Sequence, residues 1–209
     1  MYDSKRSKIF ALLTAYSWPK RRLDESKIDT SLRNKYWLKN SRKVDLNSKI
    51  LKNYEIIKKF TNTQMCTFYN SKDNEVVFSI RGTDLTRLEE NDLYLDVKVL
   101  CGKEKESSRY DKCYNMLFEI MTEYKKSKIC LCGSSLGGRI AIDLLDSDIG
   151  ERLYEVHCFN CATSLCHLYN STNCVIINQK SREKYCKKRL EKLHLHLINK
   201  DPISILSMG

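Results

Sequence analysis

The chain has 209 residues, of which 42% are hydrophobic and 30% charged. This composition fits one globular domain and excludes an intrinsically disordered chain. Lys and Arg outnumber Asp and Glu by 37 to 26, which gives a formal net charge of +11. The charge would suit an anionic membrane surface, but no nucleic-acid-binding motif accompanies it, so nucleic acid is not an expected partner. No run of 18 apolar residues occurs, so no transmembrane helix is expected.

The ten cysteines are interpreted as free thiols rather than as a disulfide framework. Cys130 and Cys132 fall in an expected core strand, where a thiol behaves as a small hydrophobe. We therefore expect a cytoplasmic or other reducing intracellular compartment. Cys158 and Cys161, with Cys166, have spacing that zinc sites use, but they lack a convincing fourth ligand beyond neighbouring histidines. Neither a metal nor another cofactor is expected.

The first half of the chain is expected to begin with helices and continue with a hairpin. An amphipathic helix is expected near residues 9–16, and the helical spacing of the apolar residues predicts another over 50–58. Residues 65–69 and 75–80 are expected to form two strands on either side of a polar turn. A polar segment at 84–106 follows, and one apolar stripe then predicts a long helix over 107–126.

The second half alternates between short strands and helices. Residues 129–132 are an expected buried strand, followed by a tight turn and a helix over 139–145. The later elements are expected strands at 156–159, 175–177 and 195–198, with a basic helix at 181–193. This order predicts an α/β fold with a mostly parallel central sheet and helices on both faces. We expect a single domain over residues 1–209, in which the helical segment 1–60 packs on the core.

A compact motif surrounds Ser135, where the chain reads Gly133-Ser134-Ser135-Leu136-Gly137-Gly138. It follows an apolar strand and precedes a helix, which is the context that a G-x-S-x-G nucleophile elbow requires. Small residues at Gly133 and Gly137 remove side chains that would clash in such a sharp turn. Ser135 is therefore the candidate nucleophile, and the amide of Leu136 at the helix N-terminus is a candidate oxyanion donor.

An apolar strand also leads into Arg81-Gly82-Thr83, upstream of the elbow. Together with Asp92-Leu93, Asp96-Val97, the long helix and Gly133–Gly138, the chain resembles the class 3, fungal-type lipases in motif order over about residues 65–165. The resemblance implies an α/β-hydrolase fold and gives Thr83 the role of a second oxyanion-hole donor. Arg81 is expected to be structural and to pair with Asp92 or Asp96. Ser134 stands where the family usually has histidine.

The acid of a catalytic triad is expected at Asp201, which follows the last predicted strand. The stretch up to Asp201-Pro202 resembles the family's strand ending at its acid. In this fold the histidine base follows the acid, but all four histidines, at 157, 167, 194 and 196, precede Asp201. Three readings stay open: the chain ends before its base, the protein is an inactive relative, or an existing histidine is recruited.

The sequence therefore predicts a serine ester hydrolase acting on lipid-type carboxylic esters, acylglycerols or phospholipids, through an acyl-enzyme at Ser135. The substrate class is implied only by the family resemblance, because a fold does not set a function. The alternative is a catalytically impaired lipase-like protein that binds or interacts, since no histidine follows Asp201. His157, His194 and His196 are expected to be structural, with the last two facing solvent or a neighbouring helix.

Overall fold

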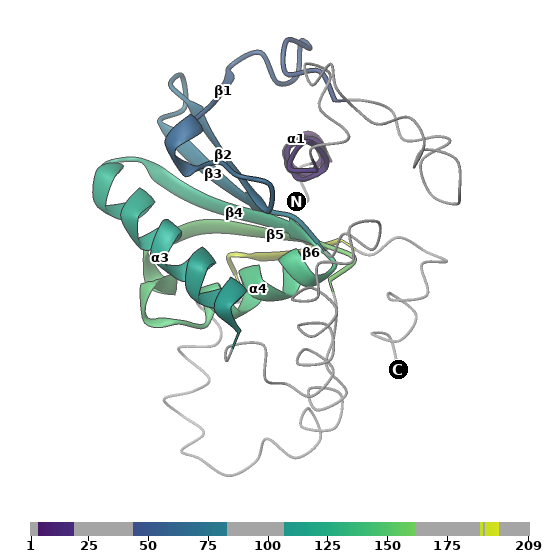
Figure 1. The fold of residues 1–209 in the computed structure, drawn as a ribbon. Coiled ribbons are helices and arrows are strands. Elements are labelled where there is room, and N and C mark those ends of the chain that lie inside the picture. The colour runs from purple at the N-terminus through teal and green to yellow at the C-terminus, as the bar shows by residue number, and fades with distance from the viewer. Residues whose placement is uncertain (1–3, 19–43, 83–106, 162–188, 190, 197–209) are drawn as a thin grey trace.

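A computed structural model describes residues 4–18, 44–82, 107–161, 189 and 191–196 (Figure 1). Its centre is a six-stranded sheet in the order β1-β2-β3-β4-β5-β6. The strands are β1 (Tyr54–Ile56), β2 (Met65–Asn70), β3 (Glu75–Ile80), β4 (Lys128–Ser134), β5 (Leu153–Phe159) and β6 (Leu193–His196). The first three pair antiparallel, whereas β3 to β6 pair parallel. The sheet is therefore mixed, with its parallel part on the side of the expected active site.

Helices cover both faces of the sheet. Helix α1 (Ser4–Tyr16) lies on one face, and α3 (Ser108–Glu123) and α4 (Leu136–Leu145) lie on the other (Figure 1). Short 3-10 turns, η3 (Lys58–Phe60) and η6 (Asp148–Arg152), connect the strands and helices around them. The layered α/β architecture expected from the alternation of strands and helices is confirmed.

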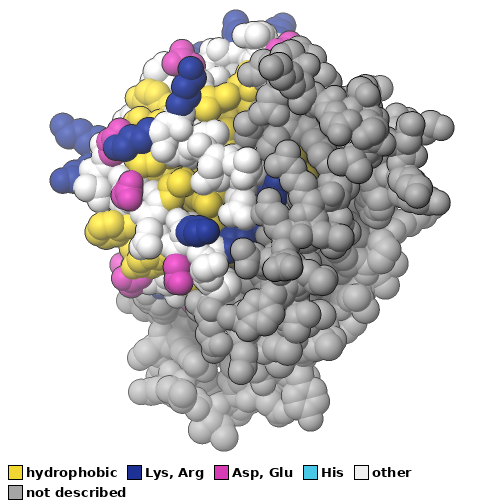
Figure 2. All heavy atoms as spheres, viewed as in Figure 1, with side chains coloured by type: hydrophobic (Ala, Val, Ile, Leu, Met, Phe, Trp, Pro, Cys, Tyr) yellow, Lys and Arg dark blue, Asp and Glu magenta, His cyan; other side chains and the backbone are white. Residues whose placement is uncertain are grey.

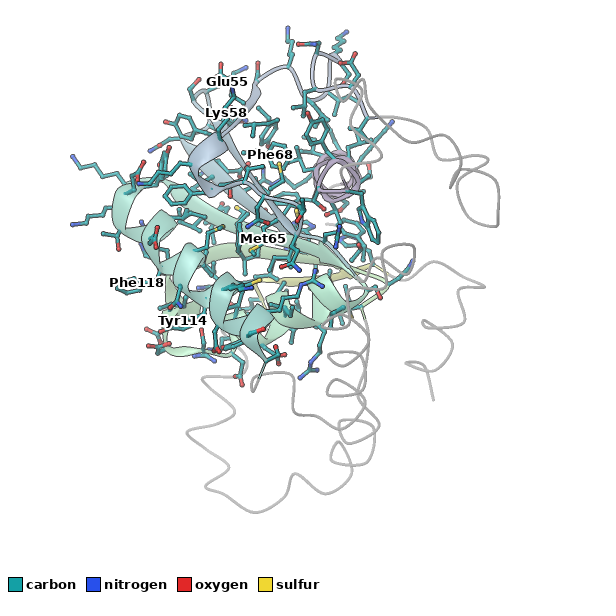
Figure 3. All side chains as sticks on the ribbon, viewed as in Figure 1. Glu55, Lys58, Met65, Phe68, Tyr114 and Phe118 are labelled. Atoms are coloured by element: carbon teal, nitrogen blue, oxygen red, sulfur yellow. The ribbon has the colours of Figure 1, made fainter. Side chains whose placement is uncertain are left out.

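The strands divide their apolar side chains between two cores, because successive residues of a strand point to opposite faces. Phe68 of β2 packs into the core beneath α1, and Met65 packs into the core beneath α3 and α4. Figure 3 shows these two side chains on opposite sides of the sheet. Parallel β4 is buried on both faces, which explains why its sequence reads as a continuous apolar run.

Several predicted elements are confirmed, with changed ends. The hairpin forms between β2 and β3, with Met65 opposite Ile80 and Asn70 opposite Glu75. Helix α3 occupies most of the predicted 107–126 segment. Helix α4 begins at Leu136, three residues earlier than predicted, because the turn at Ser135 passes directly into it.

Two predictions about local structure are wrong. The helix predicted over 50–58 is instead a series of turns that leads into β1 and η3. Its apolar residues Leu51 and Tyr54 are buried in the core beneath α1 without forming a helical face. The basic helix was predicted to extend to residue 193, but residues 191–192 form a turn and Leu193 already belongs to β6. The predicted strand 175–177 and residues 181–188 lie outside the described residues.

The described cysteines are buried free thiols, as the sequence predicts: Cys66, Cys113, Cys130, Cys132, Cys158 and Cys161. Burial raises the pKa of Cys113 and of Cys132 to about 12, so both are neutral at pH 7. Within the described ranges, no helix has the length and apolar character needed to cross a membrane. Among the described residues on the face shown in Figure 2, basic side chains stand among acidic ones and form no continuous basic patch.

Candidate active site

Ser135 occupies the sharp turn between β4 and α4. Its backbone has φ 51° and ψ −121°, which is an uncommon conformation for a residue with a side chain. Its N–H donates a hydrogen bond of 3.0 Å to the carbonyl of Phe159, at the end of the neighbouring strand β5. A strained serine at the carboxyl end of a central strand, directly before a helix, is the geometry of a nucleophile elbow.

The two glycines that flank Ser135 permit this turn. A Cβ atom on Gly133 would overlap the backbone of Gly137, and a Cβ on Gly137 would overlap the carbonyl oxygen of Ile80 at the end of β3. Both obstacles are backbone atoms, which cannot move aside as the tip of a flexible side chain could. The close packing of α4 onto the ends of β3 and β4 therefore requires glycine at both positions.

The Arg81-Gly82 segment passes directly beside Ser135. A Cβ atom on Gly82 would lie 3.2 Å from the Cβ of Ser135 and 2.8 Å from the carbonyl oxygen of Ser134. Strands β3 and β4 are parallel neighbours, so their carboxyl ends meet at the same edge of the sheet. The two motifs found far apart in the sequence are thus brought together. Thr83, the predicted second oxyanion donor, lies outside the described residues.

Arg109 binds the backbone of the Arg81-Gly82 segment, and this arginine was not identified from the sequence. It lies in the first turn of α3, is 5% exposed, and donates hydrogen bonds to the carbonyls of Arg81 and, at 3.5 Å, Gly82. Arg81 itself is fully buried, with its guanidinium 5.5 Å from the ring centre of Trp18. The structural role expected for Arg81 fits this position, whereas its expected partners Asp92 and Asp96 lie outside the described residues. No sequence signal distinguishes Arg109 from an ordinary surface arginine.

The helix N-terminus after Ser135 supplies the other predicted donor. Leu136 is the first residue of α4, and its side chain is completely buried. The first amides of a helix have no partner within it and carry the positive end of the helix dipole. This end of α4 can stabilise a negative charge that develops next to Ser135. The predicted acid, Asp201, lies outside the described residues.

Three histidines gather at a different place, on the sheet face that α1 covers. His157 of β5 is 1% exposed, and its ring stacks 4.0 Å from Phe10 of α1 and 4.4 Å from His194. His157 Nδ1 lies 3.0 Å from His196 Nε2. The structural role expected for His157 fits this burial. Among the described residues, no hydrogen bond joins Ser135 to any of these three rings.

Burial and neighbouring charges determine the protonation of this cluster. Burial lowers the pKa of His157 and outweighs the opposing effect of Glu155, and burial together with His157 lowers the pKa of His196 to about 4. Both rings are therefore neutral at pH 7. Burial opposes ionisation of Glu155, but contacts with His157 and Arg6 outweigh it and hold its pKa at about 2. A carboxylate thus stands beside neutral imidazoles.

The fold is similar to that of solved fungal lipases. Lip2 lipase from Yarrowia lipolytica matches all of this chain and 76% of its own, at 14% identity and a TM-score of 0.54. A fungal lipase in complex with an inhibitor, solved in a study of interfacial activation, matches 95% of this chain and 72% of its own, at 11% identity and a TM-score of 0.53. No family model and no curated protein matches the sequence. The chain therefore shares the α/β-hydrolase fold of these lipases.

Proposed function

We propose that the protein is a serine hydrolase of lipid-type carboxylic esters, acylglycerols or phospholipids, that forms an acyl-enzyme at Ser135. The observation that carries this proposal is the backbone of Ser135, with φ 51° at the junction of β4 and α4. Such strain costs on the order of 1–3 kcal/mol and persists only where the surrounding structure enforces it. A serine that only had to end a strand would not need it, whereas a nucleophile that must stand clear of the sheet does.

In the proposed reaction, Ser135 Oγ gives its proton to a base and attacks the ester carbonyl, and the resulting oxyanion receives hydrogen bonds from the amides of Leu136 and Thr83. The bond to the ester oxygen then breaks, and the alcohol leaves with that proton. Water afterwards hydrolyses the acyl-enzyme to the free acid and restores Ser135. The contact of Arg109 with the Gly82 carbonyl supports this arrangement. A peptide unit is planar and trans, so its N–H is directed opposite to its C=O. Holding the Gly82 carbonyl would therefore also direct the next amide, which belongs to Thr83.

Asp201 remains the proposed acid, and among the described residues no hydrogen bond joins Ser135 to a histidine that could serve as its base. The three described rings occupy the face beneath α1, with His157 buried between Phe10 and His194. The fourth histidine, His167, lies outside the described residues. Lipid esters are proposed as substrates by analogy with the fungal lipases of the same fold, and the net charge of +11 would favour an anionic membrane surface.

A catalytically impaired lipase-like binding protein is the second candidate. It is favoured by the placement of the described histidines, since His157 and His196 are joined to each other at 3.0 Å and none of them is joined to Ser135. Without a base, a serine hydrolase keeps only the residual rate that its oxyanion hole and substrate binding supply, roughly a thousandfold or more below an intact triad.

Labelling with a fluorophosphonate probe separates these two candidates. The hydrolase is expected to be labelled stoichiometrically and to cleave p-nitrophenyl esters, with both activities lost in Ser135→Ala. Ser134→Ala is the matched control, because it removes the adjacent hydroxyl and should retain labelling. Folded wild-type protein that is neither labelled nor active contradicts the proposal and supports the binding protein. Comparison of phosphatidylglycerol vesicles with a neutral acylglycerol emulsion then tests the substrate class.

A further inference from the structure

A cluster of potential metal ligands lies on the sheet face beneath α1, away from the elbow. Glu155 and His157 are two residues apart on β5 and share that face, and His194 of β6 pairs directly with His157. The carboxylate and the two imidazoles each offer one ligand atom, and these atoms all lie within 4.8 Å of one another. We propose that Glu155, His157 and His194 form a binding site for a divalent transition-metal ion of the zinc class.

The free nitrogen of His157 is the first argument. The side chain is 2% exposed, and Nε2 is buried without a hydrogen bond among the described residues. It faces Glu155 Oε2 at 3.5 Å. Two ligand atoms that each bind zinc at about 2.1 Å, at a tetrahedral angle, lie about 3.4 Å apart. A cation bound between Nε2 and the carboxylate would give Nε2 a partner with the two atoms at nearly their present separation.

The surroundings orient these ligands as the outer partners of a metal site do. His157 Nδ1 lies 3.0 Å from His196 Nε2, so a proton on Nδ1 would leave the lone pair of Nε2 for the metal. Arg6 Nε donates a 2.8 Å hydrogen bond to Glu155 Oε2, and Phe10 covers the His157 ring. A second partner on the far nitrogen and on the carboxylate commonly sets the direction of metal ligands.

The described charges beside the site are more negative than positive. Arg6 forms ion pairs with both Glu155 and the buried Glu75, so two carboxylates share one guanidinium. A divalent cation at Glu155 and His157 would add positive charge next to these carboxylates.

The donor set selects the class of ion. Two imidazoles and a carboxylate suit zinc and related transition metals, whereas magnesium and calcium prefer oxygen ligands alone. A metal lies in the plane of each imidazole that binds it, so the His194 ring, now stacked on His157 at 4.4 Å, must turn on binding. His194 is only partly buried and lies on the edge strand β6, so this rotation leaves the core intact. The bound ion would cross-link strand β6 to strand β5.

Zinc titration of the full-length chain, freed of metal by dialysis against a chelator, tests the site by calorimetry and by metal analysis. The wild type is expected to bind one Zn²⁺ per chain and to melt at a higher temperature when zinc is bound. Glu155→Gln and His194→Gln should each weaken binding at least tenfold, because even the loss of an outer partner costs about 10- to 100-fold. Both readouts are independent of ester hydrolysis.

Glu123→Gln is the matched control, since Glu123 lies on α3 across the sheet, in an exposed ion pair with Lys59. It should bind zinc as the wild type does. Circular dichroism establishes that each variant is folded, and should His194→Gln fail to fold, Glu155→Gln decides the result. The proposal is overturned by a wild type that shows no saturable binding at micromolar zinc. It is equally overturned by affinity that both ligand variants retain, which would assign the zinc to cysteine thiols elsewhere.

Discussion

The elbow at Ser135 and the histidine-rich face beneath α1 are built in opposite ways. The elbow depends on side chains that are absent, because Gly133, Gly137 and Gly82 let backbone atoms approach closely. The histidine-rich face depends on side chains that meet from distant parts of the chain, as in the ion pair between Arg6 and Glu155, which are 149 residues apart. The motif of the elbow can therefore be recognised locally in the sequence, although Gly137 also packs against the distant end of β3. The histidine-rich face exists only after β5, β6 and α1 have assembled.

The largest effect is expected from adding a methyl group at the elbow. In Gly137→Ala the new Cβ would overlap the carbonyl oxygens of Ile80 and Arg81, so α4 must move away from β3. We expect a loss of about 3 kcal/mol or more in the free energy of unfolding, measured by urea denaturation. Gly138→Ala is the graded control, because its Cβ would meet the Cβ of Cys161 at 2.9 Å. Equal stability of the two variants would contradict the backbone argument.

A loss of similar size is expected when the histidine-rich face loses the aromatic ring that covers it. Phe10 is completely buried and stacks on His157, so Phe10→Ala should lower the free energy of unfolding by about 3–5 kcal/mol. Phe118→Ala is the matched control, since Phe118 is 54% exposed on α3 and points away from the core (Figure 3). Its cost should stay below about 0.5 kcal/mol. A Phe10→Ala loss as small as that of Phe118→Ala would mean that α1 contributes little to the stability of the fold.

The same contrast explains how much the sequence could predict. The Gly-x-Ser-x-Gly turn and the β2–β3 hairpin depend on neighbours in the chain, and both were predicted from local patterns. His194 and His196 alternate with leucines on the last strand, and this pattern led to the expectation that both face solvent or a neighbouring helix. The pattern could not show that these histidines meet His157, because that depends on the register of β6 against β5.

Long-range contacts also explain the other differences. The apolar spacing of Leu51 and Tyr54 fits a helix, yet both residues are buried in the core beneath α1 from turns and a short strand. Arg109 has no sequence motif, because its role depends on where α3 begins relative to the end of β3. The assignments of Thr83 and Asp201 remain predictions.

An effect on chemistry rather than stability is expected at Arg109. Arg109→Lys keeps the positive charge but replaces the guanidinium fork that bonds the carbonyls of Arg81 and Gly82. If those bonds direct the oxyanion donor, the fluorophosphonate labelling rate should fall by about 10- to 100-fold. Arg152→Lys is the matched control, because Arg152 bonds backbone carbonyls, including that of Ser127, at the opposite end of β4. Equal labelling rates in the two variants would remove Arg109 from the site.

The smallest effect has the opposite sign and concerns Ser135 itself. Glycine adopts positive φ without the strain that a side chain incurs, so Ser135→Gly should relieve the conformation at φ 51°. Its greater flexibility when unfolded offsets part of the gain, which leaves about 1 kcal/mol of added stability. Ser135→Ala retains the Cβ and the strain, and should not be stabilised. Urea denaturation of both variants separates the outcomes: a Ser135→Gly protein no more stable than Ser135→Ala would mean that the turn stores no strain, and the elbow would lose the observation on which its catalytic role rests.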